Sequence, residues 1–147
     1  MSNVLENRRV EGDWYDKPIP EGVSWGEGFY LETAGVFRHF RSKVPHALRI
    51  GNYVSCYSGC SFSLGEKATC TVGDYTLLNG ALIMAEERIE IGSYCLISWN
   101  VGIADSDFPP IDPAQRRIDA LALSPFLKDR PSRPVLRTAP VVIRDNV

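Results

Sequence analysis

The sequence predicts an all-β solenoid of short parallel strands, and three observations support this fold class. First, an aliphatic residue followed by glycine opens three segments: Ile50-Gly51, Val72-Gly73 and Ile91-Gly92. Second, apolar side chains then recur about every six residues, which neither a helix of period 3.6 nor a strand of period 2 explains. Third, small or branched side chains follow the openers by four residues: Val54, Thr76 and Cys95. Three such hexads make one triangular coil, and neighbouring coils pair as parallel strands.

The segment before the repeat, residues 1–47, is rich in aromatic side chains and lacks the six-residue rhythm. A solenoid must cover the unpaired strand edge at its end. We therefore expect residues 1–47 to form an N-terminal cap with a flexible start. The coils themselves are expected over residues 48–104.

Within the coils, apolar side chains six and twelve residues after each opener should point inward: Cys56 and Phe62, Leu78 and Met84, Ile97 and Ile103. The spacing between the first two openers exceeds three hexads, so residues 63–71 are expected to bulge outward as a short loop. The next spacing is one residue too long, which assigns one extra residue to segment 84–90.

The four cysteines are Cys56, Cys60, Cys70 and Cys95. Their spacing lacks the paired short knuckles of a structural zinc site. We expect four buried, reduced thiols and no metal.

The rhythm stops over residues 105–140, a loop that contains seven of the ten prolines. Loops of this length are usually functional or disordered. Asp112 is placed to cap a short helix that has Pro113 at its first position and extends through residues 114–123. The rhythm returns at residues 141–147, the start of a further coil, with Ile143 as the opener and Arg144 in place of glycine. We expect a truncated or interrupted chain that lacks its C-terminal coils; the alternative is a short natural chain whose edge a partner covers.

Composition excludes several functions for this chain of 147 residues. The formal net charge of -2 gives no electrostatic case for binding nucleic acid or an anionic membrane. No apolar run reaches the length of a membrane span, and the N-terminus lacks a signal-peptide core. A cytoplasmic location is expected.

The run IEIGSYCLISWNVGIADSDFPPIDP, followed after the loop by PVVIRDNV, resembles the left-handed β-helix (hexapeptide-repeat) acyltransferases. This family includes galactoside, maltose and xenobiotic O-acetyltransferases. The resemblance covers residues 48–147 and implies left-handed coils and a homotrimer with active sites between subunits. It also implies acetyl-CoA as a co-substrate, no covalently bound cofactor, and acetyl transfer to a hydroxyl or amine of a small acceptor such as a saccharide. The family binds coenzyme A along later coils, so no cofactor-binding residue is assigned.

The family's general base is a histidine in a motif like HPxDP. Alignment on PIDP places that histidine at Pro109, and alignment on LISWNV places it at Phe108. Neither side chain accepts a proton, and loss of a general base typically costs ~10²–10⁴ in rate. The only histidines, His39 and His46, lie in the expected cap.

Three loop acids, Asp105, Asp107 and Asp112, are the remaining candidates for a catalytic role. An ordinary carboxylate is a weak base for a hydroxyl unless burial raises its pKa. Capping and turn formation, at which aspartate next to proline is good, is the alternative role.

The candidate acceptor-binding residues are Asn79, Trp99 and Asn100, which lie at or just beyond the ends of expected strands. For Trp99 the alternative is packing beneath the loop.

Two other functions remain open at this level. A non-catalytic β-helical binding or assembly module would explain the missing histidine. A γ-carbonic anhydrase-like protein needs three histidines around zinc, and two histidines outside the coils argue against it.

Overall fold

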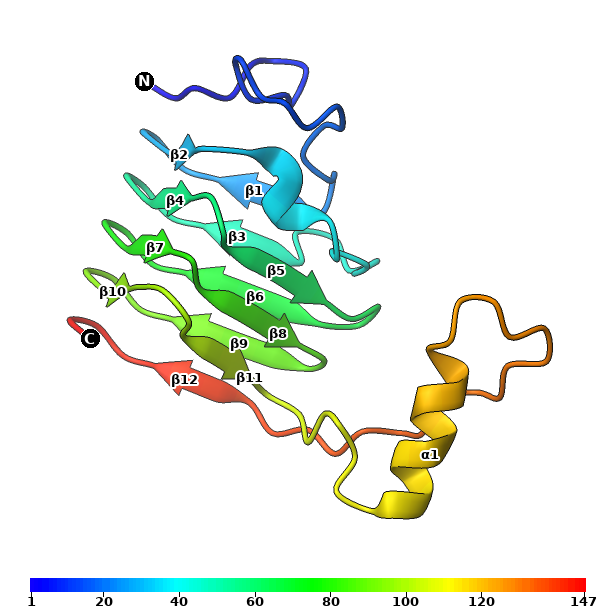
Figure 1. Cartoon of the computed structure of the whole chain (residues 1–147). Coiled ribbons are helices and arrows are strands. Elements are labelled where there is room, and N and C mark those ends of the chain that lie inside the picture. Colours follow the sequence, from blue (N-terminus) through cyan, green and yellow to red (C-terminus); the bar gives the residue numbers. More distant parts are fainter. The chain divides into compact units, whose positions relative to one another are not determined.

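The computed structural model describes residues 1–147 and contains two compact units, Met1–Asp105 with Pro140–Val147, and Ser106–Ala139. The first unit is a parallel β-helix, so the predicted all-β solenoid is confirmed (Figure 1). The second unit contains the α-helix α1 (Pro113–Ala122). The structure has no helix that combines the length and the apolar character needed to span a membrane.

Three parallel sheets form the sides of the β-helix. The first has the order β1 (Val23–Trp25), β3 (Leu48–Ile50), β6 (Thr69–Val72), β9 (Arg88–Ile91) and β12 (Val141–Ile143). The second has the order β10 (Leu96–Ile97), β7 (Leu77–Asn79), β4 (Ser55–Tyr57) and β2 (Tyr30–Leu31). The third has the order β11 (Gly102–Ala104), β8 (Leu82–Ala85) and β5 (Ser61–Leu64).

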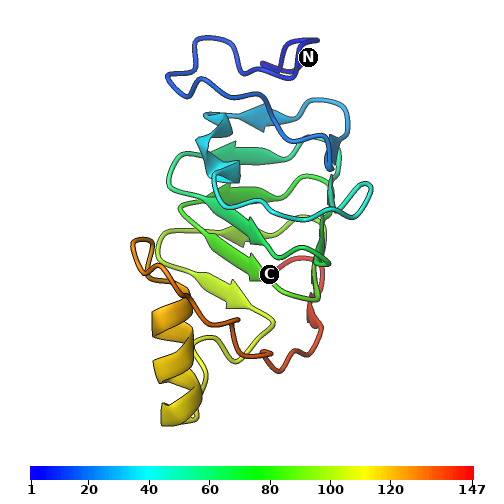
Figure 2. The same cartoon turned by 90° about the vertical axis from the view of Figure 1, so that its right-hand side faces the viewer.

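The coils wind in the left-handed sense. In Figure 1 the chain runs leftward on the far side through β6, turns at the left edge through β7 and returns on the near side through β8. Each coil lies below the one before it, and the view turned by 90° shows the same stack from the side (Figure 2).

The interior is built from side chains that stack on their counterparts in the next coil. Ile50 pairs with Val72 and Val72 with Ile91, as the opener pattern predicts. The prediction of Met84 as an inward residue is wrong, because Ile83 is the residue that pairs with Phe62 and is fully buried. The turn between β7 and β8 is one residue shorter than the turn between β4 and β5. A shift of one residue moves side chains to the other face of a strand.

The expected boundary between cap and coils at residue 47 is also wrong. β1 pairs with β3 and β2 pairs with β4, so the first coil begins at Val23. This coil keeps the period of six at Trp25, Leu31 and Phe37, but a tryptophan replaces the aliphatic opener. Phe29, which is fully buried, stands four residues after it in place of a small or branched side chain. The 3-10 helix η1 (Ala34–Phe37) completes the coil.

Residues before Val23 cover the end of the stack. The Arg8 guanidinium donates to the carbonyls of Ile19, Pro20 and Val23 at 2.6–3.0 Å. The Asn3 side chain bonds both the N–H and the C=O of Leu31, which satisfies backbone groups that no earlier strand pairs.

The glycine after each opener is required by the next coil. A Cβ atom on Gly73 would lie 2.6 Å from the backbone nitrogen of Ser93. The same corner is held by side chains two residues after the openers: Asp74 accepts the N–H of Asn52 at 2.7 Å, and Asp145 accepts that of Ser93 at 2.8 Å. After the last opener, Ile143, the place of this glycine is taken by Arg144.

Gly73→Ala is therefore expected to lower the free energy of unfolding by about 1–3 kcal/mol, the usual cost of overpacking against rigid backbone. Gly102→Ala is the matched control, because a Cβ there would meet only the Met84 side chain at 3.9 Å. Urea denaturation of both variants measures the difference. Equal effects at the two positions would contradict the close-approach explanation.

Candidate functional site

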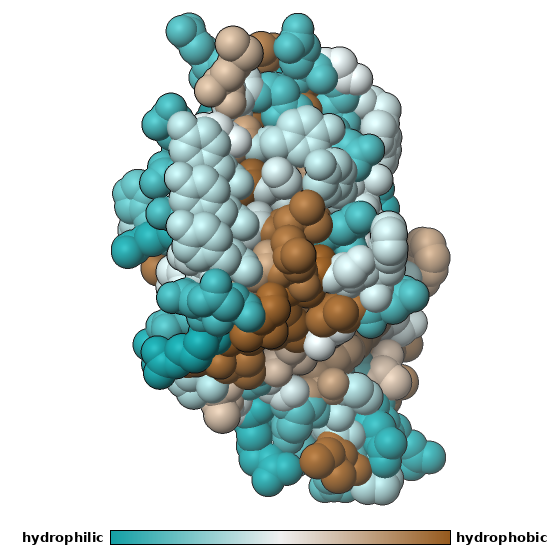
Figure 3. Space-filling model, turned by 90° about the vertical axis from the view of Figure 1, so that its left-hand side faces the viewer, coloured by the Kyte–Doolittle hydropathy of each residue, from teal (hydrophilic) through white to brown (hydrophobic).

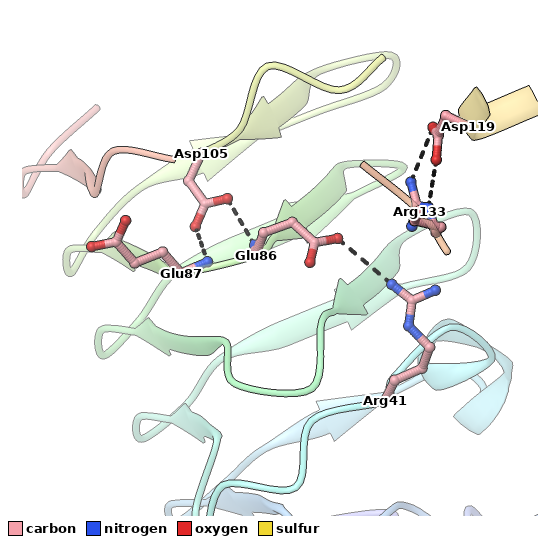
Figure 4. A network of polar contacts seen from close by, with 6 residues as sticks. All are labelled: Arg41, Glu86, Glu87, Asp105, Asp119 and Arg133. Carbon is pink, nitrogen blue, oxygen red and sulfur yellow. Dashed lines mark hydrogen bonds and ion pairs between the residues drawn. The ribbon is translucent and has the colours of Figure 1, made fainter. Parts of the chain in front are cut away.

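Asp105 directly follows β11, and its side chain is buried. The prediction that Asp105 belongs to the loop is wrong, because it lies within the β-helix unit. Its carboxylate accepts the backbone N–H groups of Glu86, Glu87 and Arg88 at 2.7–2.8 Å. Figure 4 shows the bonds from Glu86 and Glu87. Glu86 and Glu87 form the turn between β8 and β9, and Arg88 is the first residue of β9. A carboxylate held by three donors has few lone pairs left for a substrate proton.

Asp107 joins the two ends of the Ser106–Ala139 unit, because it lies near the start of the unit and binds Arg137 near its end. Its carboxylate accepts the backbone N–H of Arg137 at 2.9 Å and the guanidinium Nε of Arg137 at 3.0 Å. The hydrogen bond from the Arg137 side chain is the main reason that the pKa of Asp107 lies below its ordinary value. A carboxylate with a lowered pKa is a weaker base, so this geometry opposes the general-base role considered for Asp107.

Asp112 is the N-cap of α1, as predicted. Its side chain accepts the N–H of Ala114 at 2.9 Å, and Pro113 occupies the first turn of the helix. Asp107 and Asp112 line one hollow of about 200 Å³, whose other lining residues are Ile111, Gln115, Val135 and Arg137. Two of the three predicted acids are thus brought together in one unit, while Asp105 belongs to the other.

An ion pair that the sequence did not predict fixes α1 within its unit. The Arg133 guanidinium forms two bonds to the buried carboxylate of Asp119, at 2.7 and 3.3 Å. The same guanidinium lies over the Phe108 ring, 5.4 Å from its centroid. The two positions proposed for the missing histidine, Phe108 and Pro109, are both exposed, and an arginine cation neighbours the first.

The residues assigned to acceptor binding lie at one corner of the coils. Trp99 packs over Gly80, the residue after Asn79, so close that a Cβ on Gly80 would lie 2.8 Å from the indole. The indole remains 70% exposed. Asn100 follows in the left-handed conformation with φ 62°, and its side chain is exposed. Trp99 therefore contacts the coil and also presents a large exposed surface at the corner.

Three tyrosines from successive coils form a ladder of stacked rings, which was not predicted from the sequence. Tyr53, Tyr75 and Tyr94 stack with ring centroids 5.4 and 5.2 Å apart. Each tyrosine lies three residues after an opener and has a positive φ. The recurrence of tyrosine at this one coil position is the signal from which the ladder could have been predicted. Figure 3 shows a column of rings with an apolar patch beside it. Exposed apolar side chains from the same coils include Leu82, Leu96 and Val101.

The two histidines are exposed, whereas the four cysteines are buried. His39 and His46 are exposed, and no group of three or more histidine, cysteine or acidic side chains is placed to hold a metal ion. All four cysteines are buried, as predicted, and none of them is joined to another in a disulfide.

Comparison of the chain with protein-family models, curated proteins and solved structures found no match. Its function is therefore argued from its own residues and their geometry.

Proposed function

We propose that this protein is an acyltransferase-type β-helix that transfers an acetyl group from acetyl-CoA to a hydroxyl or amine of a small acceptor, such as a saccharide. We also propose that it works as a homotrimer and that Pro109 limits its rate. One observation supports the proposal above others. The coils are interrupted after β11 by residues Ser106–Ala139 and resume at β12 in register with β9. The interruption thus falls where the DSDFPPIDP segment, on which the acyltransferase resemblance rests, begins.

The reaction needs a group that removes a proton from the acceptor as its oxygen or nitrogen attacks the thioester carbonyl. The side chain of Pro109 has no atom that accepts a proton. Asp105, Asp107 and Asp112 are engaged by backbone or guanidinium donors. On this proposal, catalysis rests on holding acceptor and thioester together, with proton removal left to water.

Release of the coenzyme A thiol from acetyl-CoA, measured with a panel of sugar and amine acceptors, tests the proposal. We expect acceptor-dependent release at about 10²–10⁴-fold below ordinary enzyme rates, the usual contribution of a general base. Release at ordinary rates would contradict the role assigned to Pro109. A titration calorimetry experiment with coenzyme A, run in parallel, shows whether the thioester is bound at all.

The engagement of Asp105, Asp107 and Asp112 by these donors favours one second candidate, a non-catalytic β-helical binding module. Saccharide binding without coenzyme A binding, and without thiol release, would support this candidate and reject the transferase.

A further inference from the structure

The tyrosine ladder, Tyr53, Tyr75 and Tyr94, occupies one position in three successive coils and is open to solvent. Adjacent rings are nearly parallel, since the planes of Tyr53 and Tyr75 differ by 10° and those of Tyr75 and Tyr94 by 9°. The three residues are 45–58% exposed, and a column of rings is visible at the surface in Figure 3. Each tyrosine therefore has another tyrosine stacked against it and is also accessible to small molecules and proteins.

The backbone of the ladder is held in the left-handed region, with φ of 53°, 57° and 58°. Few residues other than glycine adopt this conformation, and for a bulky side chain it is an outlier. The equivalent residue of the first coil is Gly28, with φ 66°, and glycine adopts this conformation freely. Strained residues that persist in a fold are commonly functional. The recurrence of tyrosine, where glycine would cost less, thus indicates a role for the phenol side chains.

Stacking hides the faces of the rings and leaves their edges exposed. A platform for a sugar ring needs an exposed aromatic face, and Tyr75 has a tyrosine on both of its faces. The groups that the ladder offers to solvent are therefore the phenol hydroxyls and the ring carbons beside them. The Tyr53 hydroxyl donates to the Glu27 carboxylate at 2.9 Å, so a base is in place to take its proton. These are the groups that take part in one-electron oxidation of tyrosine.

We infer that the ladder is a site of oxidative cross-linking, at which a one-electron oxidant joins Tyr75 to Tyr53 or to Tyr94 through a carbon–carbon bond. Each of the two tyrosines gives one electron to the oxidant and its phenol proton to a base, which is Glu27 for Tyr53 and water for the other two. The two phenoxyl radicals then form a bond between ring carbons adjacent to their oxygens. Each of these carbons releases its hydrogen as a proton, and each oxygen takes up a proton, which restores both aromatic rings. The linked pair has lost two electrons and two protons.

The cross-link is expected within one molecule. Groups held in contact react as though they were at very high concentration, so neighbouring coils are favoured over separate chains. The new bond ties two successive coils at one corner, and a cross-link stabilises a fold by restricting the unfolded chain.

The tyrosines outside the ladder serve as internal comparisons. Tyr15 packs edge-on against Trp14. Tyr30 and Tyr57 have ring centroids 5.3 Å apart, but their planes are tilted by 50° and Tyr57 is only half-exposed. We expect the ladder to be linked in preference to this pair.

The test treats the full chain with a haem peroxidase and hydrogen peroxide, in which the two electrons and two protons reduce one peroxide to two waters. We expect dityrosine fluorescence and a monomer lighter by two hydrogen atoms. Dithiothreitol should not restore the starting mass, which distinguishes the new bond from a disulfide. Peptide mapping should join the peptide of Tyr75 to that of Tyr53 or Tyr94, and the yield per chain should not change with protein concentration.

Tyr75→Phe is the decisive variant, because it keeps a ring in the column but removes the tyrosine that neighbours both others. Tyr53 and Tyr94 are then separated by a whole coil, so loss of the ladder cross-link is expected. Tyr57→Phe is the matched control and should keep the ladder cross-link.

Two further variants give an independent measurement should Tyr75→Phe fail to fold, which circular dichroism shows. Tyr53→Phe should leave only the link between Tyr75 and Tyr94, and Tyr94→Phe only the link between Tyr53 and Tyr75. The inference is overturned if folded Tyr75→Phe still links the ladder, if the unmodified chain links only Tyr30 to Tyr57, or if oxidation gives linked dimers or no link at all.

Discussion

Histidine at position 109 is expected to raise the rate of acceptor-dependent acetyl transfer by about 10²–10⁴-fold, the usual contribution of a general base. This corresponds to about 3–5 kcal/mol of activation free energy. The position is exposed in the Ser106–Ala139 unit, so an imidazole there reaches solvent without displacing a packed side chain. Initial rates of thiol release, measured at the same sub-saturating concentration of acetyl-CoA, compare kcat/KM of the variant with kcat/KM of the unmodified chain.

Three control variants show what a rate increase means. Pro109→Gln removes the proline without adding a base and should leave the rate unchanged. Ile111→His places an imidazole on another exposed residue of the same loop and should also have no effect. Phe108→His tests the other sequence alignment. A gain with Phe108→His alone would move the missing base by one residue, and no gain with any variant would count against transferase chemistry.

The coil architecture was predictable because it rests on a repeated local rule. Each glycine after an opener is forced by the backbone of the next coil, and each inward side chain stacks on an equivalent one. The first coil was missed although Trp25, Leu31 and Phe37 keep the six-residue spacing, because a tryptophan stands in place of the aliphatic opener. Met84 was misassigned because one corner is a residue shorter, a difference that alters no residue type.

The candidate site was less predictable than the fold. The sequence identified Asp105, Asp107 and Asp112 as chemically interesting and offered both a catalytic and a structural role. Only geometry distinguishes these roles, because the donors to Asp105 come from a turn about eighteen residues earlier in the chain. The cap formed by Asp112 was predictable since all its partners are local.

Of the three acids Asp105, Asp107 and Asp112, Asp105 is the one whose removal should destabilise the protein most. Asp105→Ala is expected to lower the free energy of unfolding by about 3–5 kcal/mol, since three part-buried backbone N–H groups lose a buried, charged acceptor and a hydrogen bond to a charged group contributes ~1.5–3 kcal/mol. Asp105→Asn keeps one carbonyl oxygen but turns an N–H₂ group toward the same donors, so an intermediate loss is expected.

Asp107→Ala is the matched control: its partner Arg137 is largely exposed, and such pairs are worth at most about 1 kcal/mol. Urea denaturation followed by circular dichroism measures all three. A ranking in which Asp107→Ala costs as much as Asp105→Ala would show that the turn between β8 and β9 is held by contacts other than this carboxylate. The predicted order would instead establish that Asp105 stabilises the coil before the loop, which accounts for an acid at this position without any catalytic role.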